Sequence, residues 1–310
     1  MNEYAGSLLL APMAGVNDPV FRRICKRLGA ALTYTEMISA KGLAFGNSRT
    51  ADMLYMDPTE KPAAVQLFGH EPEVLAAQAA WLEQHHGQDI ALIDINMGCP
   101  ARKIAGKGDG AALMCDAGLA ERIIRAVVAA TTLPVTVKLR KGYELGEDTA
   151  VEFARLAEAS GAAAVAVHGR YAMQYYHGPA DKQLIGQVKQ AVRIPVIASG
   201  DVFSSADANY YLQEQGADAV MAARGAQGNP WLFAGYQPQL AERVAVAREH
   251  ALGLAELLPR RLASMRKHIA WYFKGTRQAT EIRRAVQVCR TLEDYLMLLG
   301  GIETTQSPDS

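Results

Sequence analysis

Two kinds of segment alternate over the first three quarters of the chain. Short runs of β-branched and aliphatic residues are each followed by a polar or glycine-containing turn and then by a stretch with helical periodicity. The runs predict eight strands, near Leu8–Ala11, Leu32–Thr35, Ala63–Leu67, Ile90–Asn96, Pro134–Leu139, Ala163–His168, Pro195–Ala198 and Ala219–Ala222. The stretches between them predict helices, among them Pro72–His85, Leu119–Thr131, Thr149–Ser160, Lys182–Ala191 and Ala206–Gly216.

Strands that are apolar on both faces and alternate with helices indicate a parallel sheet with crossover helices. Eight such units over about 230 residues fit a (β/α)8 TIM barrel in number and size. A doubly wound open sheet is the alternative, but it usually needs fewer strands. We therefore expect an α/β fold that begins with a TIM barrel.

After Phe233 the pattern changes to helices alone. Three are expected, at Pro238–Leu258, Arg260–Phe273 and Thr280–Met297. We predict a catalytic barrel domain over residues 1–236, a smaller all-α domain over 237–303, and a disordered polar tail over 304–310.

Charge separates the two parts of the chain. The 310 residues carry 32 basic and 32 acidic side chains, so the whole-chain balance predicts neither a nucleic acid nor a membrane as partner. Between residues 255 and 290, however, nine Lys or Arg face two Glu. This concentration predicts a positive surface on the helical domain.

The four cysteines, Cys25, Cys99, Cys115 and Cys289, are scattered and show no metal-ligand spacing. We expect neither a disulfide framework nor a metal site, and a reducing cytoplasm as location. The N-terminus predicts a strand and not a signal peptide, and no apolar run approaches the length of a membrane span.

In a TIM barrel the catalytic groups lie at the carboxyl ends of the strands. The residues expected there are Pro12, Met13, Ala14, Glu36, Gln66, Asn96, Cys99, Lys138, Arg140, His168, Arg170, Ser199, Gly200, Asp201, Ala223 and Arg224. All eight strands contribute.

Lys138 interrupts an apolar strand, where an ammonium group is costly unless an anion or an electron-rich ligand faces it. Pairing with an acid such as Asp94 is the structural alternative. His168 alone could be a satisfied core imidazole, but beside Lys138 we expect it to bind a ligand.

The loops after strands seven and eight are rich in Gly, Ala and Ser, and Arg224 lies beside them. Such loops commonly hold a phosphate in TIM barrels, although small residues are also ordinary in turns. Flavin mononucleotide (FMN) carries a phosphate and suits a lysine and an amide such as Gln66 at its ring. A sugar-phosphate isomerase would instead need a carboxylate base, for which Glu36 or Asp201 is available.

Cys99 follows the fourth strand between Gly98 and Pro100. A thiol is mostly protonated at neutral pH and can donate a proton to a developing carbanion. Most free cysteines are buried small hydrophobes, but this loop setting argues against burial. For the other three cysteines we expect no chemistry.

Several segments together resemble the tRNA-dihydrouridine synthases, and most of all the bacterial B-type. They are LAPMAGVNDPVFR, TEM, VQLFG, DINMGCPARKI, VTVKLRKGY, VHGR, PVIASGD and GADAVMAARGAQGNPWLF. The resemblance spans nearly the whole chain, and the DxNxGCP loop distinguishes this family from related flavin barrels.

The resemblance implies an FMN site. Pro12, Met13, Ala14 and Gln66 would contact the flavin ring, with Lys138 at its N1 side. The ribityl phosphate would be held by His168, Ser199, Gly200, Asp201, Ala223 and Arg224. Cys99 would be the general acid on the uracil, and the residues expected to bind the tRNA substrate are Asn96, Arg140, Arg170, Arg266, Lys267, Lys274, Arg277, Arg283 and Arg284.

The implied reaction is reduction of the C5=C6 bond of uridine in tRNA, with NADPH or NADH reducing FMN. A D-loop uridine and a monomeric enzyme are the expectations. The competing hypotheses are a flavin-dependent oxidoreductase for a small molecule, of the dihydroorotate dehydrogenase type, and an RNA-binding module without catalysis.

Overall fold

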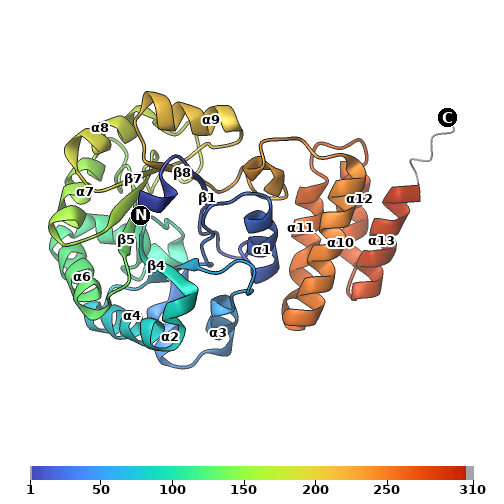
Figure 1. The fold of residues 1–310 in the computed structure, drawn as a ribbon, viewed down its shortest axis with the longest axis horizontal. Helices are drawn as coiled ribbons and strands as arrows, with labels where there is room; N and C mark the ends of the chain where they lie inside the picture. The colour runs from blue at the N-terminus through green and yellow to red at the C-terminus, as the bar shows by residue number, and fades with distance from the viewer. Residues whose placement is uncertain (1, 305–310) are drawn as a thin grey trace.

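A computed structural model describes residues 2–304 of the chain. Eight parallel strands form one curved sheet in the order β1-β8-β7-β6-β5-β4-β3-β2, which helices surround (Figure 1). The strands are β1 Leu8–Leu10, β2 Ile38–Ser39, β3 Ala63–Phe68, β4 Ile90–Met97, β5 Val135–Arg140, β6 Ala164–His168, β7 Val196–Ser199 and β8 Ala219–Ala222. The TIM-barrel prediction is confirmed.

The second predicted strand, Leu32–Thr35, is not a regular strand in the structure. Residues 33 and 34 form single bridges to β1 and β3, and β2 follows four residues later. Asn17 Nδ2 donates to the carbonyls of Ala11 and Tyr34, 2.8 Å each, and so replaces backbone donors between the two segments. The bridges nevertheless close the barrel, since Leu10 N of β1 donates to Leu32 O at 2.9 Å and Ala64 N of β3 donates to Thr33 O at 2.8 Å.

The two faces of the strands belong to two separate apolar cores. Leu9, Leu92 and Ile197 belong to the cluster inside the barrel. Leu10, Ile93 and Val196 belong to the larger cluster between the strands and the surrounding helices. This burial on both faces explains why the strands are continuous apolar runs.

Helices cover the outside of the barrel. They are α1 Pro19–Arg27, α2 Ala40–Ala44, α3 Ser48–Leu54, α4 Pro72–His86, α5 Arg102–Ala105, α6 Ala117–Ala130, α7 Ala150–Ala159, α8 Gln183–Ala191 and α9 Ser205–Asn209. The last of these continues as a π-helical turn, Tyr210–Glu214, within the predicted helix Ala206–Gly216. The other helical predictions for the barrel agree with α4, α6, α7 and α8 to within about two residues.

Within residues 2–304, four further helices follow the barrel: α10 Leu240–Leu257, α11 Met265–Tyr272, α12 Ala279–Ala285 and α13 Leu292–Thr304. The predicted continuous helix Thr280–Met297 is therefore wrong. Thr291 and Asp294 cap each other's backbone N–H groups, Thr291 N to Asp294 Oδ2 at 2.9 Å and Asp294 N to Thr291 Oγ1 at 3.2 Å, and so begin a new helix. The predicted helix Arg260–Phe273 also begins late, because Pro259–Ser264 is a 3-10 turn.

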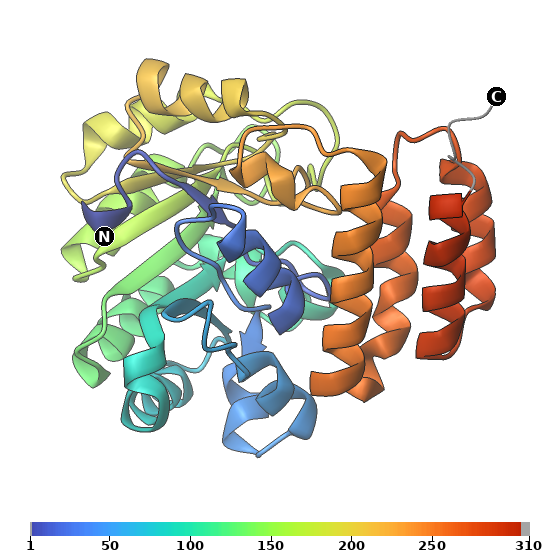
Figure 2. The same ribbon diagram turned by 45° about the vertical axis from the view of Figure 1, so that its right-hand side comes forward.

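The C-terminal helices pack on the barrel through α1. Val20 and Ile24 of α1 share one hydrophobic cluster with Val244, Ile269 and Tyr295. Figure 2 shows α10 next to α1, with α13 farther from the barrel. The boundary at residues 236 and 237 stays a prediction. Of the predicted tail, Thr304 ends α13 and the remainder lies outside the described residues. No helix described here is long and apolar enough to cross a membrane.

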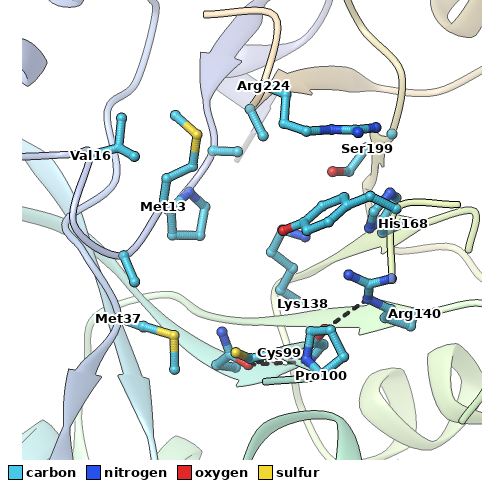
Figure 3. Close-up of a pocket in the computed structure, with 18 of the residues that line it drawn as sticks. Met13, Val16, Met37, Cys99, Pro100, Lys138, Arg140, His168, Ser199 and Arg224 are labelled. Atoms are coloured by element: carbon cyan, nitrogen blue, oxygen red, sulfur yellow. Dashed lines mark hydrogen bonds between the residues drawn. The ribbon is translucent and has the colours of Figure 1, made fainter. Parts of the chain in front are cut away.

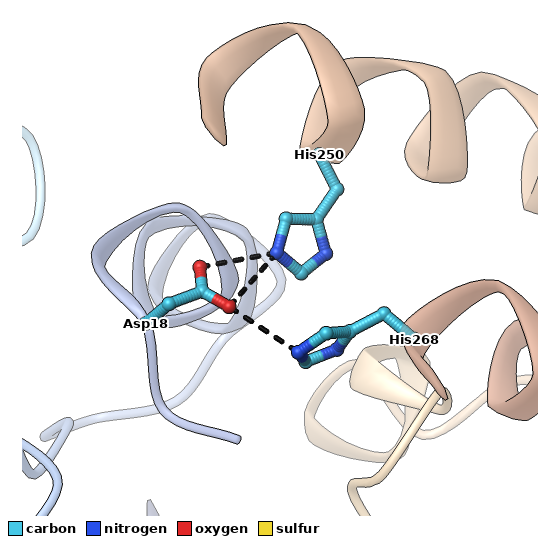
Figure 4. A group of neighbouring side chains, drawn as sticks. All are labelled: Asp18, His250 and His268. Atoms are coloured by element: carbon cyan, nitrogen blue, oxygen red, sulfur yellow. Dashed lines mark hydrogen bonds and ion pairs between the residues drawn. The ribbon is translucent and has the colours of Figure 1, made fainter. Parts of the chain in front are cut away.

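A buried polar cluster ties the two parts together (Figure 4). Asp18 caps α1 by accepting from Val20 N and Phe21 N, and the same carboxylate lies 3.0 Å from His250 Nε2 and 3.3 Å from His268 Nε2. Burial raises the pKa of Asp18, but His250 and His268 outweigh it and hold that pKa well below its usual range. The carboxylate is thus contacted from α1, α10 and α11, which joins the barrel to the helical part.

Candidate active site

A cavity of about 340 Å³ opens at the carboxyl ends of the strands. In Figure 3, Met13 lies on one side, Arg140 and His168 on the other, and Cys99 and Arg224 at opposite ends. The predicted residues that line it are Pro12, Met13, Ala14, Gln66, Asn96, Cys99, Lys138, Arg140, His168, Ser199, Gly200, Asp201, Ala223 and Arg224. The structure thus brings together all of the predicted strand-end residues except Glu36 and Arg170.

Lys138 lies on β5 with its side chain in this cavity. It makes no hydrogen bond or ion pair with another described residue. Burial lowers the pKa of Lys138 to about 8, and the neighbouring Arg140 contributes. Pairing with Asp94, the structural alternative, is absent: that carboxylate accepts from Gln66 and Thr136, both at 2.6 Å. A partly buried ammonium that faces a cavity without a protein partner is a binding group for an anion or an electron-rich ring.

Gln66 and Asn96 form a chain of hydrogen bonds beneath Cys99. Asn96 Nδ2 donates to Gln66 Oε1 at 2.7 Å, while Asn96 Oδ1 accepts from the backbone N–H of Gly98 at 3.2 Å and of Cys99 at 3.0 Å. Both atoms of the Asn96 amide are therefore engaged. Asn96 shapes the loop that carries Cys99, in addition to facing the cavity.

Cys99 is partly exposed and lines the cavity, as expected for a reactive thiol rather than a core residue. Its loop is fixed at both sides, since Gly98 O accepts from Arg140 Nε at 2.8 Å and Cys99 O accepts from Ala111 N at 3.0 Å. Cys25 and Cys289 are buried, whereas Cys115 is exposed outside the cavity.

The loops after β7 and β8 bring backbone unusually close to the cavity. Gly200 has φ +116°, and a Cβ there would lie 2.6 Å from His168 Cδ2. At Gly225 a Cβ would lie 2.0 Å from the carbonyl oxygen of Val202. Only glycine fits at these two positions. Gly200, Gly225 and Arg224 all line the cavity and form a cradle of small residues beside a cation, which is a setting that suits a phosphate.

Asp201 holds the cations of this cradle. Its two carboxylate oxygens accept from Arg170 Nη2 at 2.6 Å and from Arg224 Nη2 at 2.8 Å. Arg170 also donates to Gly178 O and is buried, and it does not line the cavity. Arg170 therefore supports the cradle from behind, where a direct contact with substrate was expected.

Two aromatic residues at the cavity wall were missed in the sequence. Tyr176 and Phe203 are 55% and 51% exposed, and the Arg224 guanidinium carbon lies 4.6 Å and 5.7 Å from their ring centroids. The sequence does contain a signal for both. Tyr176 lies in an aromatic-rich loop after β6, and Phe203 lies shortly after the predicted cavity residues of the β7 loop. Exposed rings at a cavity mouth offer stacking surfaces for a planar ligand.

The predicted cations of the helical part divide into two groups. Lys274, Arg277, Arg283 and Arg284 are exposed and make no ion pair with any residue between 2 and 304. Arg266 lines a groove of about 590 Å³ with Lys274 and Arg283. Lys267 is half-buried and donates to the carbonyl of Gly15 in the barrel, so it contributes to the contact between the two parts.

Known proteins similar to this chain point to one family. The family model described as Dihydrouridine synthase (Dus) matches residues 9–305. The tRNA-dihydrouridine synthase B of Xanthomonas axonopodis pv. citri is 40% identical over 95% of this chain and 92% of its own length. That of Shewanella oneidensis is 41% identical over 86% of this chain and 85% of its own.

Similarity to solved structures is weaker. A mandelate oxidase structure aligns with a TM-score of 0.47 and 17% identity, covering 94% of this chain and 77% of that one. A match at this level carries no argument about chemistry. The sequence relatives and the family model, by contrast, extend over nearly the whole barrel and the helices behind it, and the chain is a member of the dihydrouridine synthase family.

Proposed function

We propose that this protein reduces the C5=C6 bond of specific uridines in tRNA to 5,6-dihydrouridine, with bound FMN as cofactor and NADPH or NADH as reductant. The observation that carries the proposal is the shared cavity. One cavity holds an unpartnered Lys138, a thiol at Cys99, and a glycine cradle beside Arg224.

The residues present fit FMN. The cradle at Gly200 and Gly225 suits its phosphate, and the side chains of Met13 and Ala14 give an apolar wall for a ring. Lys138 provides a positive charge where a reduced flavin would carry negative charge. When bound, the flavin supplies the hydride chemistry, which no amino-acid side chain can perform.

The chain's own groups then have distinct tasks. Gln66 is held by Asp94 and Asn96, so its amide is fixed in orientation. Cys99 supplies a proton from Sγ to uracil C5. Its loop is fixed by the hydrogen bond that Asn96 Oδ1 accepts from Cys99 N and by the one that Ala111 N donates to Cys99 O. Arg140, whose guanidinium is held by Gly98 O and Tyr175 O, adds positive charge beside that thiol.

Binding of tRNA is assigned to the exposed cations of the helical part. Lys274, Arg277, Arg283 and Arg284 have no carboxylate partner in the described chain, and a uridine must leave its stack to enter the cavity. Phosphate contacts at these cations offset that cost. We place the target in the D-loop because of the B-type resemblance, and we propose a monomeric cytoplasmic enzyme.

Of the two candidate carboxylate bases for a sugar-phosphate isomerase, only one lies in the cavity. Glu36 lies outside the cavity, where it accepts from Gly15 N and Arg261. Asp201 does line the cavity, but Arg170 and Arg224 occupy both of its oxygens. A flavin-dependent oxidoreductase for a small molecule would use the same cavity but would have no use for the exposed cations after the barrel.

Single turnover tests the proposal. The purified protein should be yellow, and after anaerobic reduction with NADPH it should be reoxidised by tRNA that lacks dihydrouridine but not by orotate, the electron acceptor that an enzyme of the dihydroorotate dehydrogenase type would use. Cys99→Ala should bind FMN normally and slow this reoxidation by roughly 10²–10⁴-fold. Equal rates for Cys99→Ala and the unsubstituted protein would refute the acid role. Comparing dihydrouridine positions in tRNA from cells with and without the gene would identify the target.

A further inference from the structure

One wall of the active-site cavity is the loop between β1 and α1. Met13, Ala14 and Val16 of this loop line the cavity, and between them Gly15 has φ +72°. The backbone N–H and the carbonyl of Gly15 are both hydrogen-bonded to side chains from other segments. Its N–H donates to the carboxylate of Glu36, and its carbonyl accepts from Lys267 of α11. The position of the wall is thus set by two side chains that do not belong to it.

Glu36 is itself bonded to the helical part of the chain. Its side chain is 3% exposed, and its second carboxylate oxygen accepts from the guanidinium of Arg261. A carboxylate this deeply buried requires a cation or several donors, because burial without them is costly. Arg261 is the ion-pair partner that holds the Glu36 side chain against the N–H of Gly15.

The same face of α11 also contacts residues next to the cavity in two loops that line it. His268 lies 3.3 Å from the Asp18 carboxylate at the far end of the β1–α1 loop. Trp271 packs on the loop after β8, where a Cβ on Gly228 would lie 2.2 Å from the Trp271 carbonyl carbon. Lys267, His268 and Trp271 are spaced as neighbours on one helical face, so this face forms a continuous support for two cavity loops.

We propose that Glu36 and Arg261 are positioning residues of the flavin site: through Gly15 they fix the wall formed by Met13 and Ala14. The helical part therefore supports cofactor binding as well as carrying the exposed cations. This inference rests on the proposed function for the identity of the cofactor. Neither residue lines the cavity, so each acts through the β1–α1 loop.

Two adjacent arginines provide a matched comparison. Arg260 and Arg261 lie in the same 3-10 turn, and each is paired with a barrel carboxylate. Arg260 pairs with Asp52 near the surface, with its own side chain 56% exposed, whereas Arg261 pairs with Glu36 beneath the cavity wall. Arg260→Gln and Arg261→Gln thus remove the same charge from the same turn, and only the second reaches Gly15.

The experiment is a titration of the apoprotein with FMN, followed by quenching of flavin fluorescence. Arg261→Gln should weaken FMN binding by about tenfold or more, whereas Arg260→Gln should stay within about twofold of the unsubstituted protein. Arg261→Lys, which keeps a cation near Glu36, should recover much of the affinity. The visible circular dichroism of bound flavin should change with Arg261→Gln and not with Arg260→Gln, since Met13 and Ala14 line the cavity in which the ring would lie.

Glu36→Gln is the second variant, for the case that Arg261→Gln does not fold. Its amide oxygen can still accept from Gly15 N, but its NH2 group would face the donors of Arg261, so FMN binding should again weaken. Equal FMN affinity of Arg261→Gln, Glu36→Gln and the unsubstituted protein would overturn the positioning role. Equal weakening by Arg260→Gln would also overturn it. Failure of the unsubstituted protein to bind FMN would instead refute the proposed cofactor, and with it this role.

Discussion

Replacing Lys138 by methionine should stabilise the apoprotein and weaken its binding of FMN. The ammonium of Lys138 has no partner in the described chain, and its pKa falls from 10.5 to about 8. Since one pKa unit corresponds to about 1.4 kcal/mol, keeping this side chain charged in the folded apoprotein costs roughly 3 kcal/mol. Methionine has a similar length and no charge, so Lys138→Met removes that cost.

The sign of the pH dependence follows from the direction of the shift. The unfolded chain holds the Lys138 proton up to about pH 10.5, whereas the folded protein releases it near pH 8. The penalty is therefore complete below pH 8 and is relieved as the pH rises from 8 towards 10.5. Lys138→Met should raise the free energy of unfolding by up to roughly 3 kcal/mol at pH 7, and by progressively less above pH 8.

Binding of the cofactor should change in the opposite direction. A charged hydrogen-bond donor to a ligand contributes about 1.5–3 kcal/mol, so FMN affinity should fall by roughly tenfold to a hundredfold. In the unsubstituted protein that affinity should also decline between pH 7 and 9, as the ammonium of the apoprotein loses its proton. Urea unfolding of the apoprotein and fluorescence titration with FMN measure the two effects.

Lys141→Met is the control from the same strand end. Lys141 Nζ lies 2.9 Å from Asp181 and 3.3 Å from Asp148. Burial lowers the pKa of Lys141, but Asp181 outweighs it and the net shift is upward. Lys141→Met should therefore lower stability and leave FMN binding unchanged. The reasoning fails if Lys138→Met destabilises the apoprotein as Lys141→Met does, or if it binds FMN with unchanged affinity.

Three further changes test other parts of the structure. Gly225→Ala places a Cβ 2.0 Å from Val202 O and should abolish FMN binding, while Gly87→Ala, whose Cβ would meet nothing closer than 3.6 Å, should bind FMN normally in the same titration. Asp18→Asn should lower the free energy of unfolding by about 2 kcal/mol at pH 7. Because the Asp18 pKa lies well below 3.8 in the folded protein, its contribution is present above pH 3.8 and is lost as the pH falls further, so urea unfolding of the variant should depend less on pH in acid. Arg283→Gln should reduce the slope of log tRNA affinity against log salt by about 0.7–0.9, whereas Arg125→Gln, which removes a cation already paired with Glu121, should not; equal slopes would exclude Arg283 from the tRNA contact.

The sequence predicted the barrel site well because its information is local. In a parallel barrel the carboxyl ends of all strands meet at one end of the barrel. The apolar runs were therefore enough to predict that Lys138, His168 and Arg224 lie close together, and all three line one cavity. Glycines marked the phosphate cradle for a similar reason, since Gly200 and Gly225 leave no room for a side chain.

What the sequence did not predict depends on contacts between distant segments. Arg170 has the position of a ligand-binding residue, but a carboxylate 31 residues away holds it behind the cradle. Lys267 resembles a surface cation, but it bonds Gly15, 252 residues away. The break before α13, by contrast, has a local signal in the sequence, because Thr291 and Asp294 have the spacing of a helix cap. The apolar periodicity continues across this cap, and for that reason the sequence favours one long helix.

The most direct test of the central claim is anaerobic single turnover of the NADPH-reduced protein with tRNA, followed by the visible absorption of flavin. We predict that tRNA lacking dihydrouridine restores the oxidised spectrum and gains two hydrogens at one uridine, and that tRNA already carrying dihydrouridine at that position does not. A reduced flavin that persists with both tRNAs, or a purified protein that binds no flavin, would contradict it.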